Sequence, residues 1–154
     1  MISCYHVIMI KRIALITIVS GLLTACGEGT HIDADLYSYA LKFQQEAAKH
    51  GKPVSITSLD IVLADQGEDG VCIRGGGSNA VRINKKKFSQ WSEDVRTGVI
   101  FHELGHCLLD REHTEVERAS FGGPTSLMHP FVIGVNNYLQ ENWDFYMGEL
   151  FGSN

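Results

Sequence analysis

The chain has 154 residues, of which 44% are hydrophobic and 20% are charged, a composition that predicts one compact domain with a hydrophobic core. Its formal net charge is −5, and its one basic run, Lys85–Lys87, is expected to be a solvent-exposed loop or sheet edge. Nucleic-acid binding requires a basic face, so no nucleic-acid partner is expected for this acidic chain.

The first 25 residues are predicted to be a signal peptide. Lys11 and Arg12 precede an apolar run at 13–23, which is shorter than the about 20 apolar residues that a membrane-spanning helix needs. The run ends in the sequence Leu-Thr-Ala-Cys, which resembles a bacterial lipobox, whose cysteine is lipidated and becomes the mature N-terminus. We therefore expect a lipoprotein anchored in the membrane through Cys26. A plain signal peptide and a retained membrane anchor are the alternatives.

This resemblance implies a location in the bacterial cell envelope, facing either the periplasm or the outside. Gly27 after the cysteine is typical of an outer-membrane destination, and Met9 is an alternative to Met1 as the true start. Removal of residues 1–25 takes away two basic residues and no acidic residue, so the net charge changes from −5 to −7. Residues 26–32 are then expected to be a tether, and residues 33–154 the folded domain.

The first half of the domain is predicted to hold one helix and several strands. Apolar residues at helical spacing predict a helix over Asp33–His50, with Asp33 as its N-cap and with Gly51 and Pro53 ending it. A strand region is expected at 55–64, followed by a turn at 65–70 and by a hairpin whose strands are 71–73 and 81–83.

The strongest functional signal is the pattern His-Glu-x-x-His within residues 99–113. A helix is predicted here, with Ser92 or Ser89 as its N-cap. His102 and His106 are four residues apart, so both side chains project from one face of a helix and can hold one Zn²⁺. Glu103 lies beside them as a general base. A metal-free pair of core histidines is the alternative, but such buried polar groups would need other partners.

A catalytic zinc site usually has three protein ligands and an open fourth position. His113, seven residues after His106, is the predicted third ligand because imidazole suits zinc. Carboxylate alternatives lie nearby at Asp110, Glu112, Glu115 and Glu117.

Together with the string Ser-Leu-Met-His-Pro at 126–130, this stretch resembles the zincin metallopeptidases of the metzincin type. More narrowly, it is similar to small zinc-dependent peptidases found as bacterial lipoproteins. The resemblance implies an α+β, zincin-like fold with a small sheet packed on the active-site helix, and a Met-turn that places Met128 beneath the metal. The chain departs from the metzincin pattern at Leu109, where the family has glycine, and at Glu112, where it has its third histidine. The helix is therefore expected to continue until Asp110 and Arg111 end it.

A closing helix is predicted over residues 136–151. Tyr138 and Tyr146 lie on its apolar face, where core packing is the expected role, and contact with the site is the alternative.

The expected export of the chain decides which of its four cysteines can form a disulfide. Cys4 leaves with the signal peptide and Cys26 is expected to be lipidated, which leaves Cys72 and Cys107. An oxidising compartment permits a disulfide between these two, and two buried thiols are the alternative.

These residues predict a zinc-dependent peptidase, an endopeptidase acting on a peptide or protein substrate. Zinc lowers the pKa of water toward about 7 and polarises the scissile carbonyl, while Glu103 takes the water proton and passes it to the leaving amine. An edge strand above the helix is expected to hold an extended substrate. The alternatives are a zinc-binding lipoprotein without turnover and a surface lipoprotein that recruits a partner, although neither needs a general base beside the ligands.

Overall fold

The computed structural model describes residues 30–75, 79–114, 118–130 and 137–152. The expected signal peptide, the lipidation site Cys26 and the tether up to Gly29 lie outside these residues. Within the described part of the chain, no helix is long and apolar enough to cross a membrane. The elements are α1 (Ala34–Lys49), a 3-10 turn η1 (Ile56–Ser58), β1 (Asp60–Ala64), β2 (Gly70–Ile73), β3 (Ala80–Asn84), α2 (Lys85–Phe88), α3 (Glu93–Leu109), α4 (Tyr138–Glu141) and α5 (Trp143–Phe151).

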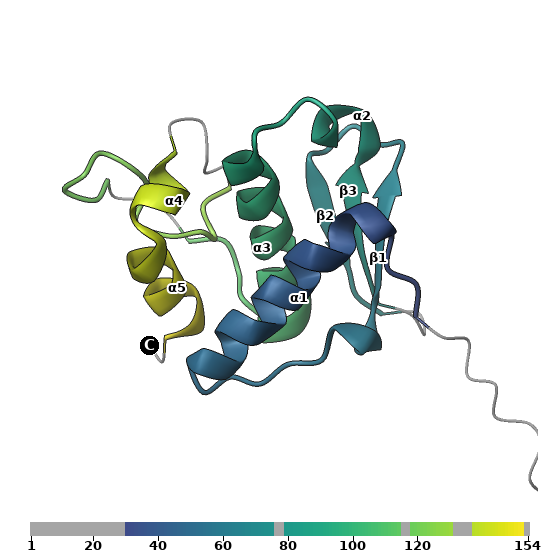
Figure 1. The fold of residues 1–154 in the computed structure, drawn as a ribbon, viewed down its shortest axis with the longest axis horizontal. Helices are drawn as coiled ribbons and strands as arrows, with labels where there is room; N and C mark the ends of the chain where they lie inside the picture. The colour runs from purple at the N-terminus through teal and green to yellow at the C-terminus, as the bar shows by residue number, and fades with distance from the viewer. Residues whose placement is uncertain (1–29, 76–78, 115–117, 131–136, 153–154) are drawn as a thin grey trace, which may run out of the picture.

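The architecture is mixed α+β, as the sequence predicts. Figure 1 shows α3 between the sheet and the pair α4 and α5, with α1 crossing in front of α3. Aromatic rings tie these helices together. Phe43 of α1 meets Phe101 of α3 at 5.2 Å and Phe151 of α5 at 5.0 Å between ring centroids. All three rings are buried, so Phe43 packs α1 against both α3 and α5 in one apolar core.

The sheet has the strand order β1-β3-β2, with β1 parallel and β2 antiparallel to β3. The predicted hairpin is confirmed, and it leaves β2 at an edge of the sheet next to α3. The predicted strand region at 55–64 is only half right, since the strand begins at Asp60. Before it, Ser58 Oγ donates to the Ser55 carbonyl at 2.8 Å, and such local bonds favour a turn over an extended strand.

The residue before Asp33 pairs with the sheet. Ile32, the last residue of the expected tether, pairs with Ile61 of β1 as an isolated parallel bridge. Asp33 precedes α1 as expected, but its side chain makes no capping bond. Its Oδ2 instead accepts from the Leu63 N–H at 2.7 Å, which joins the start of α1 to β1.

Helix α3 has the bounds that local signals predict. Ser92, rather than Ser89, is the N-cap, and its hydroxyl accepts from the Val95 N–H. The helix includes Leu109 and ends at Asp110, which has a left-handed backbone with φ 56° and ψ 32°. Aspartate tolerates this conformation better than most residues, so the chain turns without the glycine of the metzincin pattern.

Two further expectations need correction. The basic run Lys85–Lys87 is exposed at Lys85 and Lys86, as expected, but it forms the start of the short helix α2 rather than a loop or sheet edge. Asn84 caps this helix, and Lys87 Nζ binds Asp69 and the Gly67 carbonyl. The closing helix is two helices, α4 and α5, because the backbone at Asn142 leaves the helical region with φ −125° and ψ 37°.

Candidate metal centre

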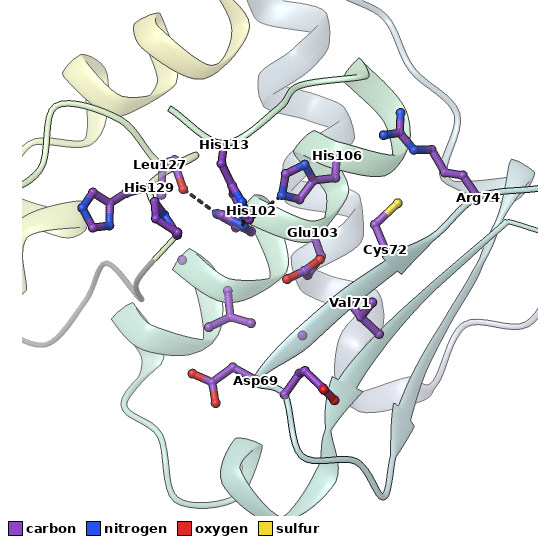
Figure 2. Close-up of a pocket in the computed structure, with 15 residues that line it drawn as sticks. Asp69, Val71, Cys72, Arg74, His102, Glu103, His106, His113, Leu127 and His129 are labelled. Carbon is purple, nitrogen blue, oxygen red and sulfur yellow. Dashed lines mark hydrogen bonds between the residues drawn. The ribbon is translucent and has the colours of Figure 1, made fainter. Parts of the chain in front are cut away.

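Three histidine side chains meet at one point. His102 and His106 lie one turn apart on α3, and the left-handed Asp110 turns the chain so that His113 returns to them. The Nε2 atom of His102 is 3.1 Å from the Nε2 atoms of both His106 and His113. Figure 2 shows the rings converging from these two segments. The group His102, His106 and His113 can hold a metal ion, with all candidate ligand atoms within 4.8 Å of one another.

The hydrogen bonds of two rings show which nitrogen atoms carry lone pairs. His102 Nδ1 lies 2.8 Å from the Leu127 carbonyl and His106 Nδ1 lies 2.5 Å from the Arg111 carbonyl. A carbonyl oxygen only accepts, so each Nδ1 is protonated and donates. Burial lowers the pKa of His102 to about 4 and also lowers that of His106, so both rings are neutral near pH 7.

It follows that the Nε2 atoms of His102 and His106 both present lone pairs, and the 3.1 Å contact between them brings two acceptors together. A bound cation would satisfy both atoms, whereas a hydrogen bond between them would need a proton that neither carries. The donor chemistry therefore fits a metal that takes imidazole nitrogen.

The carboxylates considered as alternative third ligands do not join the three histidines in the part of the chain that the structure describes. Asp110 and Glu112 are 86% and 84% exposed at their side chains, and both pair with Arg74. Glu115 and Glu117 lie outside the described residues. Of the residues that the structure describes, His113 is thus the third member of the metal-binding group.

Glu103 lies between the histidines and strand β2 (Figure 2). It is only 7% exposed, and its carboxylate accepts a hydrogen bond from the Cys72 N–H. Burial raises the pKa of Glu103 to about 7, the Cys72 bond opposes this rise, and the charge of Asp69 adds to it. Gly70 permits the close packing, because a Cβ there would lie 2.6 Å from Glu103 Cγ.

The histidines and Glu103 open into a cavity of about 480 Å³. One wall is β2 and the residues flanking it, from Glu68 to Arg74, and the other comprises α3 and the segment at 127–130. The edge strand therefore borders the candidate metal site along its length.

The Ser-Leu-Met-His-Pro segment contacts the site through its backbone. The Leu127 carbonyl accepts from His102, and the Met128 carbonyl accepts from the Thr114 N–H at 3.0 Å, next to His113. The Met128 side chain is fully buried against α3 at Gly105. This turn thus holds two of the three histidine-bearing positions from one side.

Gly105 is expected to be intolerant of a side chain. A Cβ there would lie 2.8 Å from Met128 Sδ and 3.3 Å from Leu150 Cδ1, so Gly105→Ala should lower the free energy of unfolding by about 1–3 kcal/mol through overpacking. Denaturant titration of the metal-free protein measures this change. Gly148→Ala is the matched control, because no atom lies within 4 Å of its Cβ, and alanine should be neutral or stabilising there. Equal stability of the two variants would contradict the expected clash.

Cys72 and Cys107 form a disulfide with their Cα atoms 5.6 Å apart. The bridge joins β2 to α3 one residue after His106. It resolves the two alternatives that the sequence leaves open.

The tyrosines of the closing segment pack as expected. Tyr146 is buried and its hydroxyl donates to the Pro124 carbonyl at 2.8 Å. Neither it nor Tyr138 lines the cavity. Sequence reasoning missed three residues near the site. Arg74 lines the cavity, while Arg111 and Glu149 contact the segments that bond the histidines. No sequence pattern indicates them, because most of their partners are distant in the chain.

Comparisons with protein-family models, with curated proteins and with solved structures gave no match. The class of site is therefore defined by geometry alone. It is a cluster of three histidines with a buried carboxylate beside it, in a cleft between a helix and an edge strand.

Proposed function

We propose that the protein is a zinc-dependent peptidase in which His102, His106 and His113 hold the metal and Glu103 is the general base. The convergence of three Nε2 atoms beside a buried glutamate is the observation that carries the proposal. Three imidazole ligands with an open fourth position are typical of catalytic zinc rather than of structural zinc, which has four protein ligands.

Zinc bound here would polarise the scissile carbonyl and lower the pKa of water. Glu103 would take a proton from the attacking water and give it to the leaving amine. In the metal-free site burial holds the pKa of Glu103 near 7, above that of an exposed glutamate, so the group is a stronger base, and a bound cation would favour its ionised form, which takes the proton. The hydrogen bond from the Cys72 N–H would hold the Glu103 carboxylate in one orientation during these proton transfers.

The edge strand β2 supports a peptide as the substrate. Its outer edge borders the cavity, so an extended chain could add to the sheet by main-chain hydrogen bonds and lie across the histidines. The zincin-like fold and the role of Met128 as the Met-turn residue belong to the same proposal. They are supported by the buried position of Met128, which packs against Gly105 of α3.

The proposal includes a lipid anchor at Cys26 in the bacterial envelope, with the outer membrane as the destination. The lipobox-like sequence supports the anchor, and the Cys72–Cys107 disulfide fits an oxidising compartment outside the cytosol.

The test combines metal content with cleavage. The purified protein is expected to hold about one zinc per chain and to cleave members of a peptide library detected by mass spectrometry. A chelator should stop cleavage and added zinc should restore it, while His102→Ala and His113→Ala should weaken zinc binding. Zinc binding without cleavage of any peptide would favour the non-catalytic alternative. A folded wild-type protein that binds no zinc would overturn the proposal.

A further inference from the structure

Arg111 and Glu149 form an ion pair close to the candidate metal centre without lining its cavity. Arg111 Nη2 lies 2.5 Å from Glu149 Oε1, and the two side chains are 19% and 20% exposed. Partial burial of two charges carries a desolvation cost, which is offset only where geometry and additional hydrogen bonds are good. The other hydrogen bonds of Arg111 and Glu149 involve the segments whose carbonyls accept from His106 and His102.

Arg111 supports His106. Its Nη1 donates at 2.9 Å to the carbonyls of both Glu149 and Leu150, near the end of α5, where helical carbonyls lack partners within the helix. The backbone of Arg111 is held by its own N–H, which donates to the Gly105 carbonyl at 3.2 Å, and the guanidinium adds three further points of attachment to α5. Its carbonyl is the acceptor for the His106 Nδ1–H.

Glu149 supports His102. Its second oxygen, Oε2, accepts from the Leu127 N–H at 3.3 Å. The carbonyl of the same Leu127 is the acceptor for the His102 Nδ1–H. One carboxylate on α5 therefore contacts both segments whose carbonyls orient the two helix-borne ligands.

We propose that Arg111 and Glu149 are positioning residues of the metal centre. By fixing the carbonyls of Arg111 and Leu127, the pair holds His106 and His102 as Nδ1–H tautomers with their Nε2 lone pairs converging. The inference rests on the metal centre of the proposed function and assigns new residues to it. Partners that receive the second ring nitrogen of a ligand histidine commonly change metal affinity 10- to 100-fold when lost.

The experiment uses Glu149→Gln. A glutamine amide has the same shape but one acceptor oxygen in place of two, so either Arg111 Nη2 or the Leu127 N–H loses its partner. Competition with a chromophoric chelator is expected to show zinc affinity weakened by about 10-fold, the lower end of the range for a lost direct partner, because Glu149 acts through the Leu127 and Arg111 carbonyls. In the metal-free protein, ¹⁵N NMR of the imidazoles should show the Nδ1–H tautomers of His102 and His106 in wild type and a mixture of tautomers in the variant.

Glu46→Gln is the matched control. Glu46 is also a mostly buried carboxylate in an ion pair, with Lys49 on α1, and its bonds do not reach the histidines. Both variants should lose some thermal stability. Only Glu149→Gln should change the zinc affinity and the tautomers, which separates positioning from a purely structural role.

The outcomes are distinguishable from those that test the proposed function. If wild type binds no zinc, the metal centre fails, and the positioning role fails with it. If wild type binds zinc and Glu149→Gln binds it equally well with unchanged tautomers, the positioning role alone is overturned. Should Glu149→Gln not fold, Arg111→Lys keeps a cation near the α5 carbonyls but loses the forked contact. This second variant should show the same fall in zinc affinity, and wild-type affinity would overturn the proposal.

Discussion

Glu103→Gln is expected to lower peptide hydrolysis by about a thousandfold while one zinc per chain stays bound. Glutamine preserves the volume of the side chain beside Gly70 and an oxygen that accepts from the Cys72 N–H, so the surrounding structure should be retained. It cannot take a proton from water, however. Initial rates on the best peptide of the library, with zinc measured on the same samples, test this expectation.

Glu112→Gln is the control for charge near the site. Glu112 is 84% exposed and pairs with Arg74, so solvent screens its charge and its variant should keep both zinc and activity. Full activity in Glu103→Gln would mean that Glu103 is not the general base. Loss of zinc from Glu103→Gln would mean that its carboxylate supports the metal instead.

Removal of the disulfide is expected to produce the largest loss of stability. The bridge links residues that are 35 apart in sequence, and the entropy of closing such a loop in the unfolded chain corresponds to about 4 kcal/mol. The variant Cys72→Ala/Cys107→Ala should therefore unfold at a clearly lower denaturant concentration than the oxidised wild type.

Wild type reduced with a dithiol is the internal comparison, because it loses the bond but keeps both side-chain volumes. Its stability should fall with that of the double variant. Unchanged stability in both samples would show that packing of β2 on α3 holds the two elements together without the bridge. Activity measured in parallel would report whether the Cys72 N–H still reaches Glu103.

Much of the secondary structure could be predicted because its determinants are local. The N-cap Ser92, the apolar spacing of α1 and α3 and the turn before β2 are all recognisable within a few residues. Predictions that assumed a local role for a side chain were less accurate. Asp33 was expected to cap α1, but its carboxylate binds the Leu63 N–H, whose position depends on the sheet. The single closing helix likewise failed at Asn142, where no proline or glycine marks the break.

The sequence by itself determined that His102 and His106 share a helix face with Glu103 beside them, because the helical repeat depends only on spacing. Tertiary structure decided the rest of the site. It selected His113 over Asp110 and Glu112, paired Cys72 with Cys107, and buried Glu103 against the backbone of Gly70. It also brought Glu149 within reach of the segments that orient the histidines. These features join residues far apart in the chain, so they exist only once α3, the sheet and α5 have packed around a common core.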